Sequence, residues 1–198
     1  MAARRIGFCL IAKRLTALYF GRGNLIPFID NLEEIHVHGY PFVVHVTIVE
    51  YPSAINLFVP PVDVQAAAFI GLANAYGLGV LVCRYDPIVL SPLTPVEFHL
   101  ENFERKFMRL MGSTDEVVIP FKTPYRRSRR NLDAATNRCG FNWWQAVESE
   151  FMALSREFAS NAASNGMQVS LCSQPQFQIL EVHTATCVDA GRLAQVSG

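Results

Sequence analysis

Charged side chains follow several apolar runs of this sequence, where buried strands are expected to end. Arg84 ends the apolar run that begins at Leu78, Asp86 comes two residues later, and Lys122 follows the run 116–121. Because the carboxyl ends of parallel strands meet at one edge of a sheet, we expect these side chains to gather there. Cationic groups at such an edge are typical of a site for phosphate or carboxylate. The other candidates for this anion site are Lys13, Tyr125, Arg126 and Arg130.

A structural interpretation of these charges stays open beside the functional one. Arg84 and Asp86 stand two residues apart and can pair with each other to hold a loop. The four arginines within 126–130 are more typical of a solvated loop than of a binding site. As a nucleic-acid patch they lack a supporting basic face and an aromatic ladder. A small anionic ligand is therefore the expected partner, and nucleic acid is not.

Thiols are the other source of possible chemistry. The chain has five cysteines, at positions 9, 83, 139, 172 and 187, and no pair has the C-x-x-C spacing. Cys172 and Cys187 are weak candidates for metal ligands, with His183 between them, but their spacing matches no zinc or iron–sulfur motif. His45 and Cys83 lie inside apolar runs, where packing roles are expected. The odd number and long spacings predict reduced thiols and a cytoplasmic location.

Composition limits the class of protein. Of 198 residues, 51% are apolar and 17% are charged, and 17 basic residues balance 17 acidic ones. This excludes a disordered chain and argues against a mainly electrostatic binder. The apolar run 42–49 is much shorter than the roughly 20 residues of a membrane span, so no membrane association is expected. No dinucleotide-binding, P-loop, zinc-protease or serine-hydrolase motif occurs.

Strand and helix patterns alternate along the chain. Strands are expected at 6–12, 41–49, 78–84, 116–121 and 167–172, and helices at 24–38, 61–76, 95–111 and from Trp143 or Trp144 to 164. Thr94 and Glu97 are predicted to form a capping box at the third helix. We expect a long polar connection at 123–140 and only weak patterning after Ser173. The alternation predicts an α/β fold with a mainly parallel sheet, either open or forming a partial barrel.

Three segments of the sequence resemble a bacterial family catalogued as domain of unknown function 1848. They are Arg84–Ser91 (RYDPIVLS), His99–Phe103 (HLENF) and Pro124–Leu132 (PYRRSRRNL). Weaker similarity extends to residues 39–47, to Cys172 and to the segment 187–189. The resemblance implies a fold related to the TIM barrel, as a partial or incomplete (β/α) repeat.

The same resemblance implies a type of chemistry but does not indicate which substrate is used. Complete members end in a cysteine cluster similar to that of radical S-adenosylmethionine enzymes, so an iron–sulfur cluster and S-adenosylmethionine are the implied cofactors. Residues 1–198 are expected to form a single α/β domain that lacks the opening strand and that cysteine cluster. The cofactors are therefore implied by the family and not by the residues present. The alternative is a non-catalytic module, or a fragment, that binds an anion or metabolite.

Overall fold

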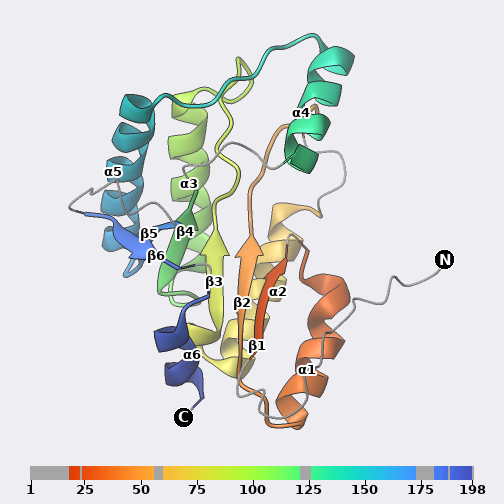
Figure 1. Ribbon diagram of the computed structural model, residues 1–198, viewed down its shortest axis with the longest axis vertical. Coiled ribbons are helices and arrows are strands. Elements are labelled where there is room, and N and C mark those ends of the chain that lie inside the picture. Colours follow the sequence, from red (N-terminus) through yellow and green to blue (C-terminus); the bar gives the residue numbers. More distant parts are fainter. Residues whose placement is uncertain are drawn as a thin grey trace, which may run out of the picture.

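The six described strands form one parallel sheet whose spatial order follows the chain. The computed structural model describes residues 18–22, 24–55, 60–120, 126–172, 181–186 and 188–197. The strands are β1 (Leu18–Arg22), β2 (Phe42–Thr47), β3 (Leu81–Arg84), β4 (Glu116–Ile119), β5 (Gln168–Cys172) and β6 (His183–Ala185). Their order is β1-β2-β3-β4-β5-β6, and every neighbouring pair is parallel (Figure 1). This is the winding of a β/α barrel left open, so the predicted partial (β/α) fold is confirmed.

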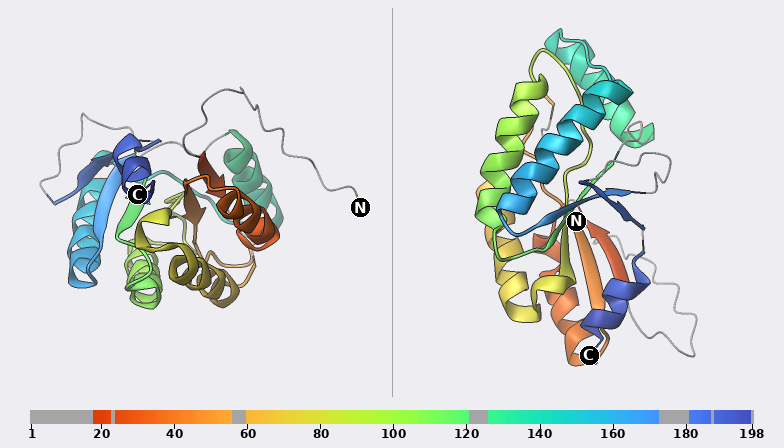
Figure 2. Two further views of the ribbon diagram at one scale, coloured as in Figure 1. Left: turned by 90° about the horizontal axis from the view of Figure 1, so that it is seen from below. Right: turned by 90° about the vertical axis from the view of Figure 1, so that its left-hand side faces the viewer.

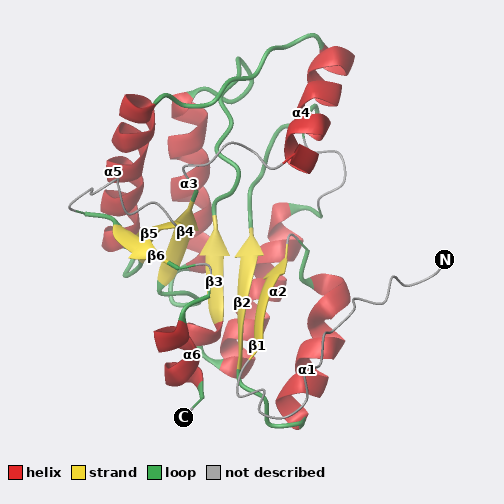
Figure 3. Ribbon diagram, in the orientation of Figure 1, coloured by secondary structure: helices red, strands yellow, loops and turns green. Residues whose placement is uncertain are grey.

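Helices cover the sheet unequally. The convex face carries α1 (Ile29–Val37), α2 (Val62–Tyr76), α3 (Val96–Leu110) and α5 (Glu148–Ser164). The short helix α6 (Ala190–Val196) lies across the sheet from them (Figure 2). Helix α4 (Arg126–Cys139) lies beyond the strands' carboxyl ends (Figure 3). Single 3-10 turns occur at Ile26–Phe28 and Leu78–Val80. None of the described helices is long and apolar enough to cross a membrane.

Both faces of the sheet are buried, as the continuous apolar runs predict. On β3, Cys83 packs against the convex-face helices, whereas its neighbour Val82 packs on the concave face. The helix side contains the stacked rings of Phe103 and Phe158, whose centroids are 4.1 Å apart. The concave cluster is smaller, and Leu193 of α6 packs against it. Side chains of the concave face therefore alternate with the main core along each strand.

Helix α6 is attached to the concave face by one buried arginine. The Arg192 guanidinium donates to Asp115 and Glu116, each at 2.8 Å, and to the Gly79 carbonyl at 3.1 Å. Asp189 caps the helix by accepting from the Arg192 backbone N–H. These contacts hold α6 near the amino-terminal end of β4.

Most of the expected elements are confirmed to within a few residues, and two expectations about helices are wrong. Residues 126–139 form α4 rather than a polar connection, because Leu132 and Ala135 give that segment a narrow buried side. Helix α5 begins at Glu148, since Trp144 instead forms an isolated antiparallel bridge with Leu90. The strand expected at 6–12 lies outside the described residues, and β1, β6 and α6 were not expected.

The capping box predicted at α3 does not form. Pro95 is the N-cap residue, and no side chain caps the helix. The Thr94 hydroxyl instead donates to the Val89 carbonyl at 2.9 Å and lies 2.7 Å from the Ser91 hydroxyl. Thr94 therefore stabilises the segment that leaves β3 rather than the first turn of α3.

Candidate functional site

A pocket of about 210 Å³ lies at the carboxyl ends of β2 and β3. Thr47 and Asp86 line it from the strand ends, and Ser128, Asn131 and Leu132 line it from α4. Parallel α/β folds place their ligand sites at this edge. Helix α4 forms one side of the pocket and is tied to the β2 side by a hydrogen bond of 3.0 Å from Arg138 to the Ala54 carbonyl.

Asp86, which lines this pocket, forms an ion pair with Arg84, which is not one of the lining residues. Arg84 Nη2 donates to Asp86 Oδ2 at 2.8 Å, and the two side chains are only 19% and 17% exposed. Arg84 is in register with Thr47 on β2, so both side chains point to the concave face. The structural interpretation of this pair is therefore confirmed: the two residues do hold each other.

The ion pair uses only part of what its two groups offer. A guanidinium has five N–H donors. Asp86 accepts from Nη2, and the buried Nε of Arg84 has no hydrogen-bond partner among the described residues. Burial raises the pKa of Asp86 above its ordinary value, and the neighbouring Arg84 only partly offsets this. The site thus combines an incompletely used cation with a poorly hydrated carboxylate.

Tyr51 fixes the loop that carries Asp86. Its hydroxyl donates to the Pro87 carbonyl at 2.5 Å and accepts from the Val89 N–H at 3.2 Å. Burial raises the pKa of Tyr51 well above its ordinary value, which keeps the hydroxyl protonated as a donor. The Asp86–Pro87 peptide bond is cis. The backbone after β3 is therefore held from the β2 side of the pocket.

Helix α3 holds the same loop from beneath. His99 Nε2 lies 2.9 Å from the Val89 carbonyl, which can only accept, so Nε2 carries the proton. Nδ1 then accepts from the Tyr85 hydroxyl at 3.0 Å. Burial lowers the pKa of His99, in keeping with this neutral form. The RYDPIVLS and HLENF segments thus act together, because the His99 side chain of the second contacts the Val89 backbone of the first.

His45 lies on the concave face of β2, two residues before Thr47, and its side chain is shielded from solvent. Its side chain is buried, and burial, with Arg84 and Arg192 nearby, lowers its pKa to about 4. The imidazole is therefore neutral at pH 7. This agrees with the packing role expected from its place inside an apolar run.

The described thiols do not fit an iron–sulfur cluster. Cys83 is buried among the helices of the convex face, where burial raises its pKa to about 12, and Cys172 lies on the opposite face. Cys139 is exposed at the end of α4. Within the described ranges, no three His, Cys, Asp or Glu side chains are placed to hold a metal ion. Cys187, the other weak metal candidate, lies outside those ranges.

The structure brings together only part of the predicted anion site. Lys13, Lys122 and Tyr125 lie outside the described residues. Arg126 begins α4, its side chain is not described, and Arg130 is exposed on that helix. The neighbouring Arg129 lies over the Trp143 ring at 5.9 Å.

The residues of the pocket that sequence reasoning missed are Tyr51, Ser128 and Asn131. The sequence does contain a pattern that predicts the α4 side of the pocket. Ser128, Asn131, Leu132 and Ala135 are spaced i, i+3, i+4 and i+7, which places them on one helical face. Tyr51 offers no such signal, because its partners Pro87 and Val89 lie more than thirty residues away.

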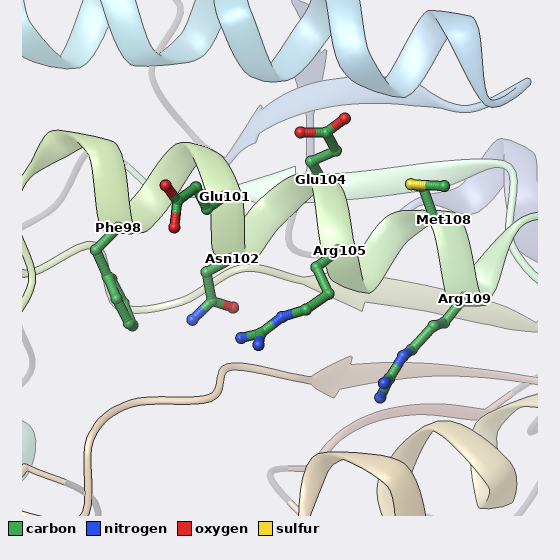
Figure 4. A pocket seen from close by; sticks show the side chains of 7 residues that line it. All are labelled: Phe98, Glu101, Asn102, Glu104, Arg105, Met108 and Arg109. Atoms are coloured by element: carbon green, nitrogen blue, oxygen red, sulfur yellow. The ribbon is translucent and has the colours of Figure 1, made fainter.

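A larger hollow of about 710 Å³ runs along the exposed side of α3 (Figure 4). The described residues that line it all belong to α3. Its arginines are already paired, Arg105 with Glu50 at 3.0 Å and Arg109 with Asp63. It lies on the helical side of the sheet, so we do not assign the ligand site to it.

Comparison with known proteins places the chain in a family. The family model described as Domain of unknown function (DUF1848) matches residues 4–198, which is nearly the whole chain. None of the curated proteins matches it. The match includes the RYDP, HLENF and PYRRSRRN segments, two of which meet at the loop after β3. The chain belongs to the DUF1848 family.

Proposed function

We propose that this protein binds a small molecule at the carboxyl ends of β2 and β3, and that Arg84 recognises an anionic group of that molecule. The observation that carries this proposal is the incompletely used guanidinium of Arg84, whose buried Nε has no described partner. Charge-assisted hydrogen bonds to carboxylate or phosphate are the strongest that such a group can make.

The pocket supports a ligand that is also partly apolar. Val49, Ile55 and Leu132 contribute aliphatic walls, and Thr47 and Ser128 contribute hydroxyl groups. Ligand sites commonly combine mainly apolar walls with a few polar groups that fix orientation. The volume of about 210 Å³ suits a metabolite smaller than a nucleotide.

A catalytic role is the second candidate, and it comes from the family resemblance. In a radical S-adenosylmethionine-like enzyme, Arg84 would bind a carboxylate of the substrate or cofactor at the same edge. Cys172 supports this candidate, because it ends β5 at that edge. Since the described thiols do not form a cluster site, we derive no chemical step through an iron–sulfur group. A reducing, cytoplasmic location, supported by the free thiols of Cys83 and Cys139, would suit either candidate.

Thermal unfolding with two simple anions tests the binding proposal. Ligands that bind only the folded state raise the melting temperature. We expect hexanoate or inorganic phosphate to raise it for the wild type and for Arg156→Gln, a control at an exposed position of α5. Arg84→Gln should lose the response while keeping the fold. An equal response in Arg84→Gln would overturn the role of Arg84.

Anaerobic reconstitution with iron and sulfide tests the catalytic candidate separately. A bound cluster would give roughly four irons per chain and a broad absorbance near about 400 nm. A folded sample without bound iron would contradict this candidate and leave the binding proposal unaffected.

A further inference from the structure

Asp86 lines the pocket, and its ion-pair partner Arg84, which is not one of the lining residues, brings the opposite charge next to it. The two groups are 2.8 Å apart, and each is less than one-fifth exposed. A ligand with only a negative charge would share the Arg84 guanidinium with Asp86 and bring a second anion beside that poorly hydrated carboxylate. Two anions that share one cation repel each other, which is unfavourable where both are poorly hydrated. A simple anion is therefore not the best complement of this ion pair.

Asp86 faces the ligand space more directly than Arg84 does. Asp86 lines the pocket, and Oδ2 is its only oxygen with a described hydrogen-bond partner. The other polar side chains that line the pocket are those of Thr47, Tyr51, Ser128 and Asn131. Each of these can donate as well as accept a hydrogen bond, so among the described lining residues Asp86 is the one whose ionised side chain can only accept. A ligand that enters the pocket should carry donors, and a cationic donor suits Asp86 best.

These observations, together with the function proposed above on which this inference rests, assign a ligand class. We propose that the ligand is a zwitterion of the α-amino-acid type. Its carboxylate accepts from the N–H groups of Arg84 that Asp86 does not use, and its ammonium donates to Asp86. The carboxylate and ammonium of an α-amino acid stand on one carbon, so they approach each other about as closely as the two protein groups do. Its side chain lies against the aliphatic walls formed by Val49, Ile55 and Leu132.

Three matched compounds separate the contributions of the two charges. L-Norleucine carries both groups on an aliphatic chain, hexanoate lacks its ammonium, and pentylamine lacks its carboxylate. Thermal shifts titrated with each compound give three apparent affinities for the full chain. We expect norleucine to bind the wild type at least roughly tenfold more tightly than either analogue, because each analogue leaves one charge of the pair uncompensated.

Charge-neutral variants assign each contact. Asp86→Asn keeps the shape of the side chain but removes its charge, so hexanoate should bind this variant about as well as norleucine does. The control Glu157→Gln, at an exposed position of α5, should behave as the wild type. If hexanoate and norleucine bind the wild type equally, and both responses disappear in Arg84→Gln, the zwitterion inference is overturned while the anion site stands. If none of the three compounds binds, or pentylamine alone does, both the inference and the proposed function fail.

Discussion

Tyr85 and His99 face each other in the core, with Tyr85 Oη 3.0 Å from His99 Nδ1. Through Nε2, His99 also holds the Val89 carbonyl, so one imidazole connects helix α3 to the segment that carries Asp86. Tyr51 holds the same segment from the other side. The candidate site is therefore built on a buried polar network and not on a free loop.

Removing the Tyr85 hydroxyl should weaken this network. Tyr85→Phe keeps the ring packed against Phe103 and Phe158 but leaves His99 Nδ1 without its donor. An unpartnered buried acceptor costs about 1–2 kcal/mol, and the free energy of unfolding in urea should fall by that amount. An unchanged urea midpoint would show that the hydroxyl does not support the loop.

Breaking the Arg84–Asp86 pair from one side should cost more than removing both charges. Arg84→Ala leaves the Asp86 carboxylate poorly hydrated and unpaired, so we expect a loss of about 1–3 kcal/mol of stability. In the double variant Arg84→Ala with Asp86→Ala, part of that loss should be recovered. Chemical denaturation of the four proteins of this cycle gives the coupling between the two residues. Strictly additive losses would contradict the observed ion pair.

Lys106 is expected to destabilise the fold at neutral pH. Its side chain is 2% exposed, its Nζ has no hydrogen-bond partner among the described residues, and the nearest carboxylate oxygen, Oε2 of Glu50, is 3.8 Å away. Replacing such a group by an apolar one of similar length removes the cost of burying the charge. Lys106→Met should therefore raise the free energy of unfolding by about 1–3 kcal/mol. A loss of stability would show that the ammonium makes a net favourable interaction.

The same lysine predicts a pH dependence. Burial lowers the pKa of Lys106 from 10.5 to about 8 in the folded protein. Between these values the unfolded chain binds more protons, so this residue makes stability rise as the pH increases from about 8. The difference in unfolding free energy between wild type and Lys106→Met should shrink over this range. A difference that stays constant from pH 7.5 to pH 10 would contradict the lowered pKa.

His45 predicts a loss of stability in acid. Its pKa is lowered from 6.5 to about 4, first by burial and then by Arg84 and Arg192. The stability that depends on neutral His45 is complete above pH 6.5 and is lost as the pH falls toward 4, by up to about 3 kcal/mol. The NMR signals of the His45 ring should not titrate between pH 7 and pH 5. A midpoint near 6.5 would contradict the burial of this ring.

The elements with strong periodicity could be predicted from the sequence. Local periodicity alone predicts β2 and β3, which are continuous apolar runs, and α3, which has an apolar face. Helix α4 was missed because, of its residues from Ser128 onward, only Leu132 and Ala135 are buried, among many polar residues. Helix α6 was missed because it has seven residues and its anchor, Arg192, pairs with Asp115 and Glu116, more than seventy residues earlier.

The candidate site was predictable only at its strand end. Arg84 and Asp86 follow an obvious strand, so the parallel sheet alone predicts that they lie at the carboxyl edge. Whether they pair with each other or bind a ligand was left open by the sequence, and the ion pair of 2.8 Å decides that they pair in the structure described. Tyr51 and the α4 residues that line the pocket can be assigned to the site only from the tertiary structure, which brings them to this edge.

The binding role of Arg84 is tested most directly by observing its own Nε–H group. In a ¹⁵N-labelled sample, the Arg84 Nε–H signal can be assigned by its absence in Arg84→Gln and then followed during a titration with L-norleucine and with hexanoate. A carboxylate bound at the proposed site should shift this signal progressively to saturation, while the Nε–H signal of Arg156 stays in place. An Arg84 signal that does not move at high concentrations of both compounds would contradict the anion site.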